Sequence, residues 1–292
     1  MEKLIEEHQE KLKELESKVE SYKESICQEI NTDLQFLLRF LVVAKFDVAK
    51  AASRYKNYYK AVLNLPGITQ VLENPDALEQ VFKDMHQMHM HKTGCLYGLD
   101  SEKRIICYFT AKKMASVTRI ENTDLAMILN MLLGFEVIYE FFGSECLENG
   151  LLMVNQYEAS SVREGLTTLD VVRLFNPITV GKHFSALMSN CVPVKQKKMI
   201  LVNMPTCMNA VLAATRPFMS KKLNDRIVKI YTENTKDDEK LKSIFGGEDY
   251  TPDCFGGKRT EWKDIEEDMP WEDIRLMYYK WFKICLPLKF QL

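Results

Sequence analysis

Apolar residues in the first thirty positions recur at alternating spacings of three and four, which predicts one charged helix over residues 1–30. The apolar positions are Ile5, His8, Leu12, Leu15, Val19, Tyr22 and Ile26. So narrow a stripe forms either a seam with a second copy of the chain or a contact with the protein's own body. The second interpretation is favoured, and we expect a monomer.

Residues 31–85 are predicted to form a small all-helical domain. Asp33 and the two polar residues before it can cap the helix that follows. The segment LQFLLRFLVVAKFDVAKAASRYKNYYKAV contains two helical patterns that join near Lys45 and Phe46. Its apolar residues are too many for one exposed face, so these helices pack against another part of the chain. Proline and glycine at positions 65–67 and 74–75 mark the link to the next domain.

From residue 93 onward, short β-rich segments alternate with long apolar ones. Strands are predicted at residues 94–99, 104–110, 151–157, 199–202 and 227–231. Helices are predicted at residues 124–142, where Gly134 allows close packing, and at residues 169–188, with Pro177 near the middle. The first two strands form a hairpin, and the others follow crossovers long enough for parallel pairing. The pattern therefore predicts a mixed, mainly parallel sheet flanked by helices, an α/β fold that encloses an apolar pocket.

This α/β domain is expected to span residues 86–258. The remainder, residues 259–292, begins polar and acidic and ends in an aromatic segment that docks on the body. The domain's central stretch is residues 199–226, where the apolar strand MILV stops at Pro205 and a helical pattern follows. Pro217 interrupts that helix, and its end is basic. A buried strand followed by an apolar, proline-broken, basic-ended helix predicts a movable lid on an apolar cavity.

Overall composition is that of an ordinary globular protein, with 46% apolar and 27% charged residues in 292. The net charge of −2 provides no overall attraction to nucleic acid. The eight cysteines contain no C-x-x-C pair, which indicates reduced thiols. The charged start lacks a secretory signal pattern, and no apolar run reaches the roughly 18 residues of a spanning helix. These features predict a cytoplasmic protein.

Positive charge is concentrated in one part of the chain. Between positions 195 and 229 there are eight basic residues and one acid. Such a run is often only a solvated face, but this one adjoins the apolar lid helix. Basic residues close to an anionic bilayer contribute about 1 kcal/mol each to binding. The segment therefore favours transient docking on an anionic membrane.

Catalytic and cofactor motifs are not recognisable in the sequence. It contains no G-x-G-x-x-G, G-x-x-x-x-G-K-[ST] or G-x-S-x-G pattern. Cys207 has apolar neighbours and no positioned base, and His86, His89 and His91 lack a further Cys or acidic ligand. We expect no enzyme activity, no cofactor and no metal. The 15 methionines either fill gaps in the core or line a surface that adapts to a flexible apolar guest.

Several segments resemble the CRAL-TRIO family. These are LQFLLRFLVVAKFDVAKA, NGLLMVNQYEAS, MILVNMP, RPFMSKKLNDRI and TPDCFGG. They occur in the family's order over roughly residues 30–258, and the branch they resemble contains alpha-tocopherol transfer protein and cellular retinaldehyde-binding protein. Departures from the family pattern include Val42 and Ala44 in place of two arginines, and Gln156 and Ala159 in the acidic turn.

The resemblance implies a deep lipid pocket whose floor is the sheet and whose cover is a gate helix. Ligand-binding residues carried over by motif are Leu133, Val137, Leu151, Met153, Asn155, Phe184, Leu187, Met188, Val192, Met199, Leu201, Val211, Leu212 and Phe218. Residues implied to bind phosphoinositide head groups at the membrane are Lys195, Lys197, Lys222 and Arg226.

Together these features predict a non-catalytic carrier of a small hydrophobic lipid, such as a retinoid, tocopherol or terpenoid, through the cytosol to or from membranes. One alternative is phosphatidylinositol or phospholipid transfer. A second is a regulatory module in which the N-terminal stripe or the aromatic tail binds a protein. An enzyme on the same fold is a third, but it would need a positioned nucleophile or a cofactor loop.

Overall fold

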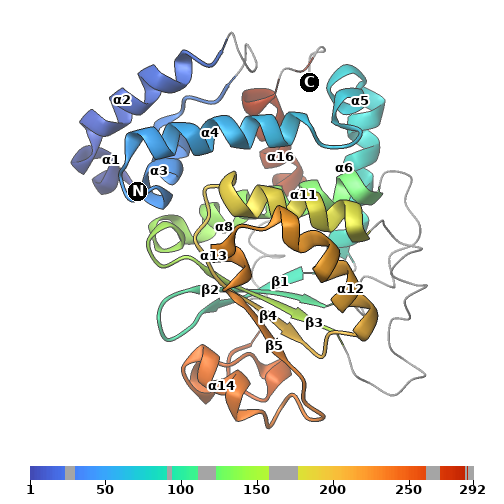
Figure 1. Cartoon of the computed structure of the whole chain (residues 1–292). Coiled ribbons are helices and arrows are strands. Elements are labelled where there is room, and N and C mark those ends of the chain that lie inside the picture. The colour runs from blue at the N-terminus through green and yellow to red at the C-terminus, as the bar shows by residue number, and fades with distance from the viewer. Residues whose placement is uncertain are drawn as a thin grey trace.

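A central sheet carries a thick helical cover on one face and a thinner layer on the other (Figure 1). The structure, a computed structural model, describes residues 1–23, 30–90, 94–110, 123–157, 177–260, 270–286 and 288. The strands are β1 (Gly94–Leu99), β2 (Ile105–Thr110), β3 (Leu151–Gln156), β4 (Gln196–Val202) and β5 (Ile227–Ile230). They lie in the order β1-β2-β3-β4-β5, with β1 antiparallel to β2 and every other pair parallel. The predicted fold class is confirmed.

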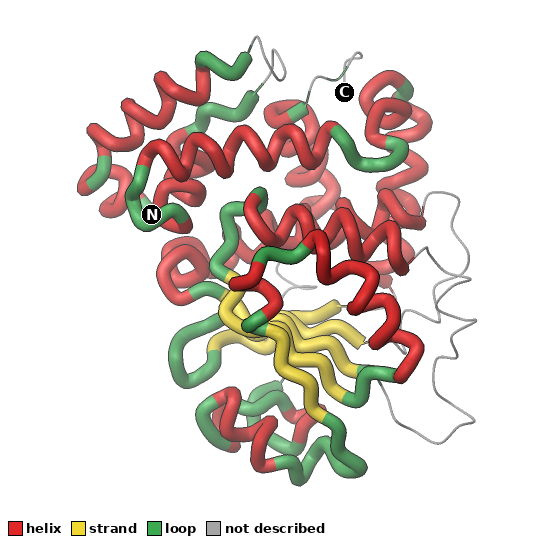
Figure 2. Tube along the Cα trace, viewed as in Figure 1, coloured by secondary structure: helices red, strands yellow, loops and turns green. Residues whose placement is uncertain are grey.

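This sequential strand order determines where the helices lie. Each parallel connection moves one strand along in the same direction, and right-handed crossovers that all step the same way place their helices on one face. That face is covered by α8 (Thr123–Asn149), α11 (Pro177–Asn190), α12 (Thr206–Thr215) and α13 (Lys221–Asn224). Figure 2 shows these helices stacked above the strands, and the segment that follows β5, up to residue 260, below them. We call the two sides the crossover face and the C-terminal face.

The C-terminal face is closed by α14 (Glu239–Phe245) and two 3-10 turns, Glu248–Tyr250 and Asp253–Phe255. Leu241, Phe245 and Phe255 pack there as part of a separate apolar cluster. Gly256 ends this layer with a φ of 78°, and a Cβ at that position would lie 2.1 Å from the carbonyl oxygen of Lys236. The TPDCFGG segment therefore needs its glycine to close the layer against the chain.

The N-terminal helices are α1 (Glu2–Glu7), α2 (Gln9–Glu20), α3 (Leu34–Val43) and α4 (Val48–Leu63). The prediction of one helix over residues 1–30 is wrong, because the chain breaks at His8, whose ring lies 3.9 Å from that of Phe46. The stripe does pack on the protein's own body: Leu12, Leu15 and Val19 are fully buried, and α2 contacts α3 and α4. Residues 24–29 lie outside the described part of the chain.

The predicted junction between α3 and α4 is confirmed. Asp33 accepts hydrogen bonds from the backbone N–H groups of Gln35 and Phe36, and it caps α3. Lys45 and Phe46 then adopt left-handed φ values of 56° and 61°. α5 (Ile68–Glu73) and α6 (Pro75–Met90) follow, so the predicted domain boundary after residue 85 falls inside a continuous helix.

α8 is the longest helix in the described part of the chain, and it differs from the prediction in three ways. It continues to Asn149 through a kink at Gly143, which has φ 46° and ψ −118°. It is long and apolar enough over Asp124–Gly143 to cross a bilayer, contrary to our expectation, although 61% of that window is buried inside the protein. The close packing predicted at Gly134 is wrong, because no described atom lies within 4 Å of the position of a Cβ there.

The second crossover helix also begins differently from the prediction. α11 starts at Pro177, so this proline stands at a helix start, where its missing N–H costs nothing, and not in a helix interior. Residues 169–176 of the predicted helix lie outside the described part of the chain. A helix over residues 177–190 remains, and it contacts α4, α8 and α12.

The aromatic tail forms α16 (Trp271–Cys285), which docks on the body as expected. Its Arg275 forms an ion pair with Glu79 of α6 at 2.7 Å, and Trp271 stacks on the ring of His86 with centroids 4.7 Å apart. His86 therefore has a packing role. Among the described residues, which exclude His91, no cluster of His, Cys, Asp and Glu could hold a metal ion.

Candidate functional site

Successive side chains of β3 point to opposite faces of the sheet. Leu151 and Met153 belong to the large core under the crossover helices, whereas Leu152 and Val154 belong to the cluster on the C-terminal face. Asn155 has the same parity as Met153, so it also faces the crossover side.

The strand pairing brings the residues predicted for the pocket floor together. Met199 and Leu201 of β4 lie beside Met153 and Asn155 respectively, and both belong to the core under the crossover helices.

One cross-strand row near the carboxyl ends of the strands is partly polar. It runs Phe109, Asn155, Leu201 and Lys229 from β2 to β5. Leu201 is buried, while the other three are only partly buried. Lys229 donates a hydrogen bond from Nζ to Oδ1 of Asn209 on α12 at 2.6 Å. Sequence reasoning missed Phe109 and the role of Lys229, because both depend on the register between strands.

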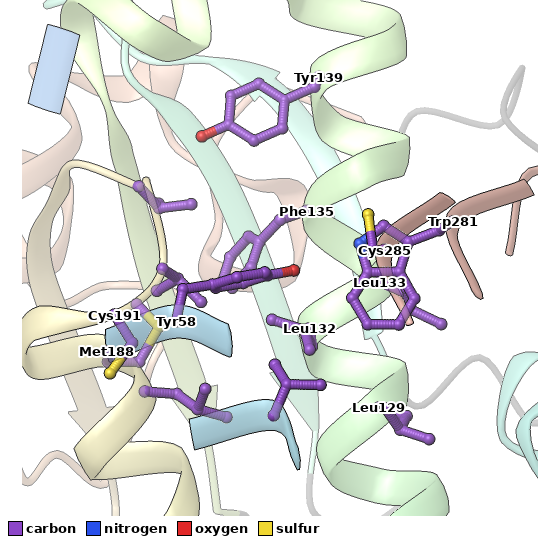
Figure 3. Packing of buried hydrophobic residues seen from close by; sticks show 14 of the residues in the cluster. Tyr58, Leu129, Leu132, Leu133, Phe135, Tyr139, Met188, Cys191, Trp281 and Cys285 are labelled. Carbon is purple, nitrogen blue, oxygen red and sulfur yellow. The ribbon is translucent and has the colours of Figure 1, made fainter. Parts of the chain in front are cut away.

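The first group of residues predicted for the pocket wall lies on α11 and just after its end. Leu187, Met188 and Val192 are buried, and Phe184 is partly buried against the same core. Figure 3 shows Met188 beside Cys191 and Tyr58, where α11 meets α4. Met188 therefore contributes to the packing between α11 and the N-terminal helical layer.

On α8, Leu133 is fully buried and Val137 is 8% exposed. Figure 3 shows Leu133 on the side of α8 where Trp281 and Cys285 of α16 pack. A different stripe of α8, at Met127, Met131 and Gly134, is only partly buried, and the space beside Gly134 is open. These three residues were not among the predicted ligand contacts, and they have the i, i+4, i+7 spacing of one helix face.

The predicted lid consists of α12, a 3-10 turn over Arg216–Phe218 and α13. Leu212 is buried and Val211 partly buried, as expected for an inner face. The prediction that Phe218 faces inward is wrong, because its side chain is 40% exposed and Lys182 Nζ lies 5.1 Å from the centroid of its ring. The 3-10 turn at Pro217 rotates Phe218 outward, and Met219 packs against the core instead.

The lid is held mainly against α11. A Cβ at Gly181 would lie 2.7 Å from Cγ2 of Thr215, so the two helices touch at that point. At the other end of α11, the hydroxyl of Ser189 accepts a hydrogen bond from the N–H of Ser220 at 2.8 Å and donates to the carbonyl of Phe218 at 3.4 Å. Ser220 also caps α13 by accepting from the N–H of Leu223. These contacts fasten the middle of the lid, from the end of α12 to the start of α13, to one helix.

The four predicted head-group residues gather at the far end of the lid. Burial lowers the pKa of Lys222, and the neighbouring charges of Arg226, Arg54, Lys45 and Lys197 lower it further. Two of these neighbours, Lys45 and Arg54, come from the turn after α3 and from α4, and sequence reasoning missed them.

Lys195 belongs to the same group of cations. Burial lowers its pKa, as do Lys197 and Lys45, while Glu148 opposes the shift. The six residues Lys45, Arg54, Lys195, Lys197, Lys222 and Arg226 are called the cation cluster below. Because neighbouring cations lower the pKa of Lys222 and of Lys195, a bound anion would relieve the repulsion.

Two members of the cation cluster also hold the structure together. The guanidinium of Arg54 donates to the carbonyl of Val192 at 3.0 Å, and that of Arg226 donates to the carbonyl of Gln196. Lys197 and Lys222 are exposed. The cluster thus joins the N-terminal helices, the start of β4 and the end of the lid.

The fold, with its helix-covered sheet face, is that of a lipid-binding and lipid-transfer protein. The CRAL/TRIO domain family matches residues 89–257, more than half of the chain, and the chain belongs to that family. A solved structure described as the crystal structure of Sfh5 is similar over 86% of this chain and 87% of that one, with a TM-score of 0.51. At 12% identity this likeness shows the fold alone. Proteins of the CRAL/TRIO family are generally not enzymes.

Proposed function

We propose that this protein binds a small hydrophobic lipid between the crossover face and the lid, and carries it to or from anionic membranes. The observation that carries the proposal is the partly buried, partly polar row Phe109, Asn155, Leu201 and Lys229 beneath a lid that is fastened to α11. On the opposite face, beside the apolar cluster, the polar side chains of Tyr108 and Gln156 hydrogen-bond each other, whereas Asn155 has no such partner among the described residues.

Affinity and release place different demands on such a site. Apolar burial stabilises a bound lipid by about 0.8 kcal/mol per CH₂ group, so a chain of many carbons binds tightly with few polar contacts. Release therefore requires the lid to open where its apolar surface stays out of water. A membrane surface satisfies this requirement, because the bilayer replaces the contacts that opening removes.

The outer surface of the lid suits that role. Its exposed residues include a run of small and apolar side chains, namely Ala210, Ala213, Ala214, Pro217 and Phe218. The cation cluster lies at the end of the same lid. Anionic lipid head groups attract each nearby Lys or Arg with about 1 kcal/mol, so the cluster would hold the membrane while the lid contacts it. Phosphoinositides, with several negative charges, fit a six-cation cluster better than singly charged lipids do.

A transfer assay with matched variants tests the proposal. Lys197→Glu with Lys222→Glu reverses two exposed charges, and the structure shows no hydrogen bond that either lysine makes within the described chain. We expect transfer of a fluorescent lipid to phosphoinositide-containing vesicles to slow by about tenfold or more, with equilibrium binding of the lipid unchanged. The control is Lys236→Glu with Lys240→Glu, which changes the charge by the same amount at two exposed residues. Lys240 lies on α14, in the layer that covers the C-terminal face. Equal transfer rates for both pairs would refute the docking step.

A regulatory module without a ligand is the competing hypothesis. That hypothesis needs an N-terminal stripe or an aromatic tail that is free to bind a protein. However, Leu12, Leu15 and Val19 of the stripe are fully buried, and the tail helix α16 packs on α6 and α8. Native mass spectrometry of the purified protein separates the two hypotheses. A co-purified lipid supports the carrier, and an empty protein with a stable protein partner supports the module. We propose that the carrier acts as a cytoplasmic monomer.

A further inference from the structure

Lys229 occupies an unusual place for a charged residue. It lies on the edge strand β5, and its register partner is Leu201, so its side chain is on the crossover face. Its Nζ reaches Asn209 on α12, the first helix of the lid, and the side chain is only partly exposed. An ammonium group in that position lies at the junction of the floor and the lid.

The charge of Lys229 has no acidic partner among the described residues. Its hydrogen-bond acceptor is the neutral amide oxygen of Asn209, and Lys229 takes part in none of the ion pairs that those residues form. An ammonium has three N–H donors, and only one of them is used here. A partly buried charge with a neutral partner is less stable than one paired with an anion.

Asn155 supplies a second unsatisfied polar group in the same row. It lies in the central strand, on the crossover face, and it is separated from Lys229 by Leu201 alone. Its side-chain amide makes no hydrogen bond to another described residue, and the side chain is only partly exposed. A polar side chain near the end of a covered sheet face can bind a polar group of a ligand.

We infer that Lys229 and Asn155 bind the carboxylate of an amphiphilic lipid whose hydrocarbon part lies along the apolar floor. The inference rests on the proposed lipid-carrier function and narrows its ligand to a lipid acid. The carboxylate would lie over Leu201, accepting hydrogen bonds from the ammonium on one side and from the amide on the other. The flexible four-carbon stem of lysine allows its head to reach inward from the edge strand.

The single charge favours a carboxylate over a phosphate. One ammonium balances one negative charge, whereas a phosphate monoester carries about 1.5 to 2 at neutral pH. Multiply charged head groups match the cation cluster instead. That cluster includes Lys197, four residues before Leu201 on β4 and therefore roughly 13 Å away along the strand. The two sites would thus bind different lipids.

Paired probes that differ only in the end group test the inference. Delipidated protein is titrated with cis-parinaric acid and with its methyl ester, whose fluorescence rises on burial. We expect the acid to bind at least about tenfold more tightly than the ester, as a charge-assisted hydrogen bond implies. Lys229→Gln keeps a donor for Asn209 but removes the charge, so it should bring the acid to the affinity of the ester and leave the ester unchanged. Asn155→Leu should weaken the acid by a smaller factor.

Two further variants complete the design. Lys229→Arg keeps the cation and should restore most of the preference for the acid, and Lys240→Gln on α14 should leave both probes unaffected. If the wild type binds acid and ester equally, or Lys229→Gln keeps the preference for the acid, the inference is overturned while the carrier function stands. If the wild type binds neither probe and co-purifies with no lipid, the proposed function itself fails.

Discussion

The two faces of the sheet are built from alternate residues of the same strands, yet they differ sharply. On the C-terminal face, Leu152, Val154, Ile200 and Val202 are all apolar and fully buried. The crossover face has the same apolar base at Met153 and Met199, but nearer the strand ends it has polar residues and incomplete burial. Polar residues also occur on the C-terminal face, but there Tyr108 donates a hydrogen bond to Gln156. That face holds the strands in register, and this leaves the other face able to keep a polar side chain, Asn155, that has no such partner among the described residues.

The largest expected effect comes from removing a side chain on the C-terminal face of the sheet. Leu152→Ala deletes a fully buried side chain in the central strand, and the free energy of unfolding should fall by about 2–5 kcal/mol. Asn155→Ala, three residues along the same strand, should change it by less than about 1 kcal/mol because that side chain makes no hydrogen bond to another described residue. Urea unfolding of delipidated protein measures both values. Equal losses would show that the two faces do not differ as described.

The next effect concerns the contact between α11 and the lid. Gly181→Ala places a Cβ against Cγ2 of Thr215, whose rotamer is held by its hydroxyl donating to the carbonyl of Leu212 at 3.1 Å. Overpacking of this kind costs about 1–3 kcal/mol of stability and should speed lipid exchange by loosening the lid.

A second substitution provides the control for that contact. Adding Thr215→Ser removes the clashing methyl group and keeps the hydroxyl, so the double variant should recover wild-type stability and exchange rate. No recovery would mean that Gly181 acts through something other than Thr215. Stopped-flow lipid exchange and urea unfolding measure the two quantities.

A smaller effect of opposite sign is expected at the other helical glycine. Gly134→Ala meets no described atom, so it gains helix propensity without a clash, and stability should rise by about 0.5–1 kcal/mol. Thermal unfolding of the variant beside the wild type checks this. A loss of stability would mean that the space beside Gly134 is filled.

The smallest effect is a pH dependence on α11. Burial lowers the pKa of His183, the charge of Lys182 lowers it further, and Asp124 opposes them. The unfolded chain, with an ordinary histidine pKa of about 6.5, therefore takes up this proton at a higher pH than the folded protein. Stability should fall as the pH drops below about 6.5. His183→Gln should reduce that fall measurably in urea titrations at pH 7.5 and 5.5, and an identical pH profile would contradict the assignment.

The regular parts of this fold are predictable because local pattern and global packing agree. Strands buried on both faces contain unbroken apolar runs, and MILV at the end of β4 shows this clearly. Asp33 and Asp47 stand at positions where a cap is needed, and both cap their helices. The crossover rule then leads from element order to sheet order without further information.

The parts that failed depend on contacts between distant segments. The break at His8 coincides with a ring contact to Phe46, and nothing within residues 1–20 indicates it. Phe218 faces outward because of a 3-10 turn, whereas helical periodicity alone assigns it inward. Lys45 and Arg54 join the cation cluster from positions more than 140 residues before Lys195. No short window of sequence contains both partners of the ring contact or of the cation cluster, whereas the turn at Phe218 is local.

The sequential strand order has a practical consequence for engineering. Since every crossover steps the same way, β3 to β5 and the described crossover helices all lie within residues 123–230, while the N-terminal helices and the C-terminal layer are encoded outside that range. One continuous range of sequence therefore encodes most of the floor and the whole lid, and it can be exchanged as a unit. Exchanging it between family members, with β1 and β2 kept in place, would change the floor and the lid together. The residues of α8 and α11 that contact the N-terminal helices, and those of β3 and β4 that contact the C-terminal layer, would have to be kept.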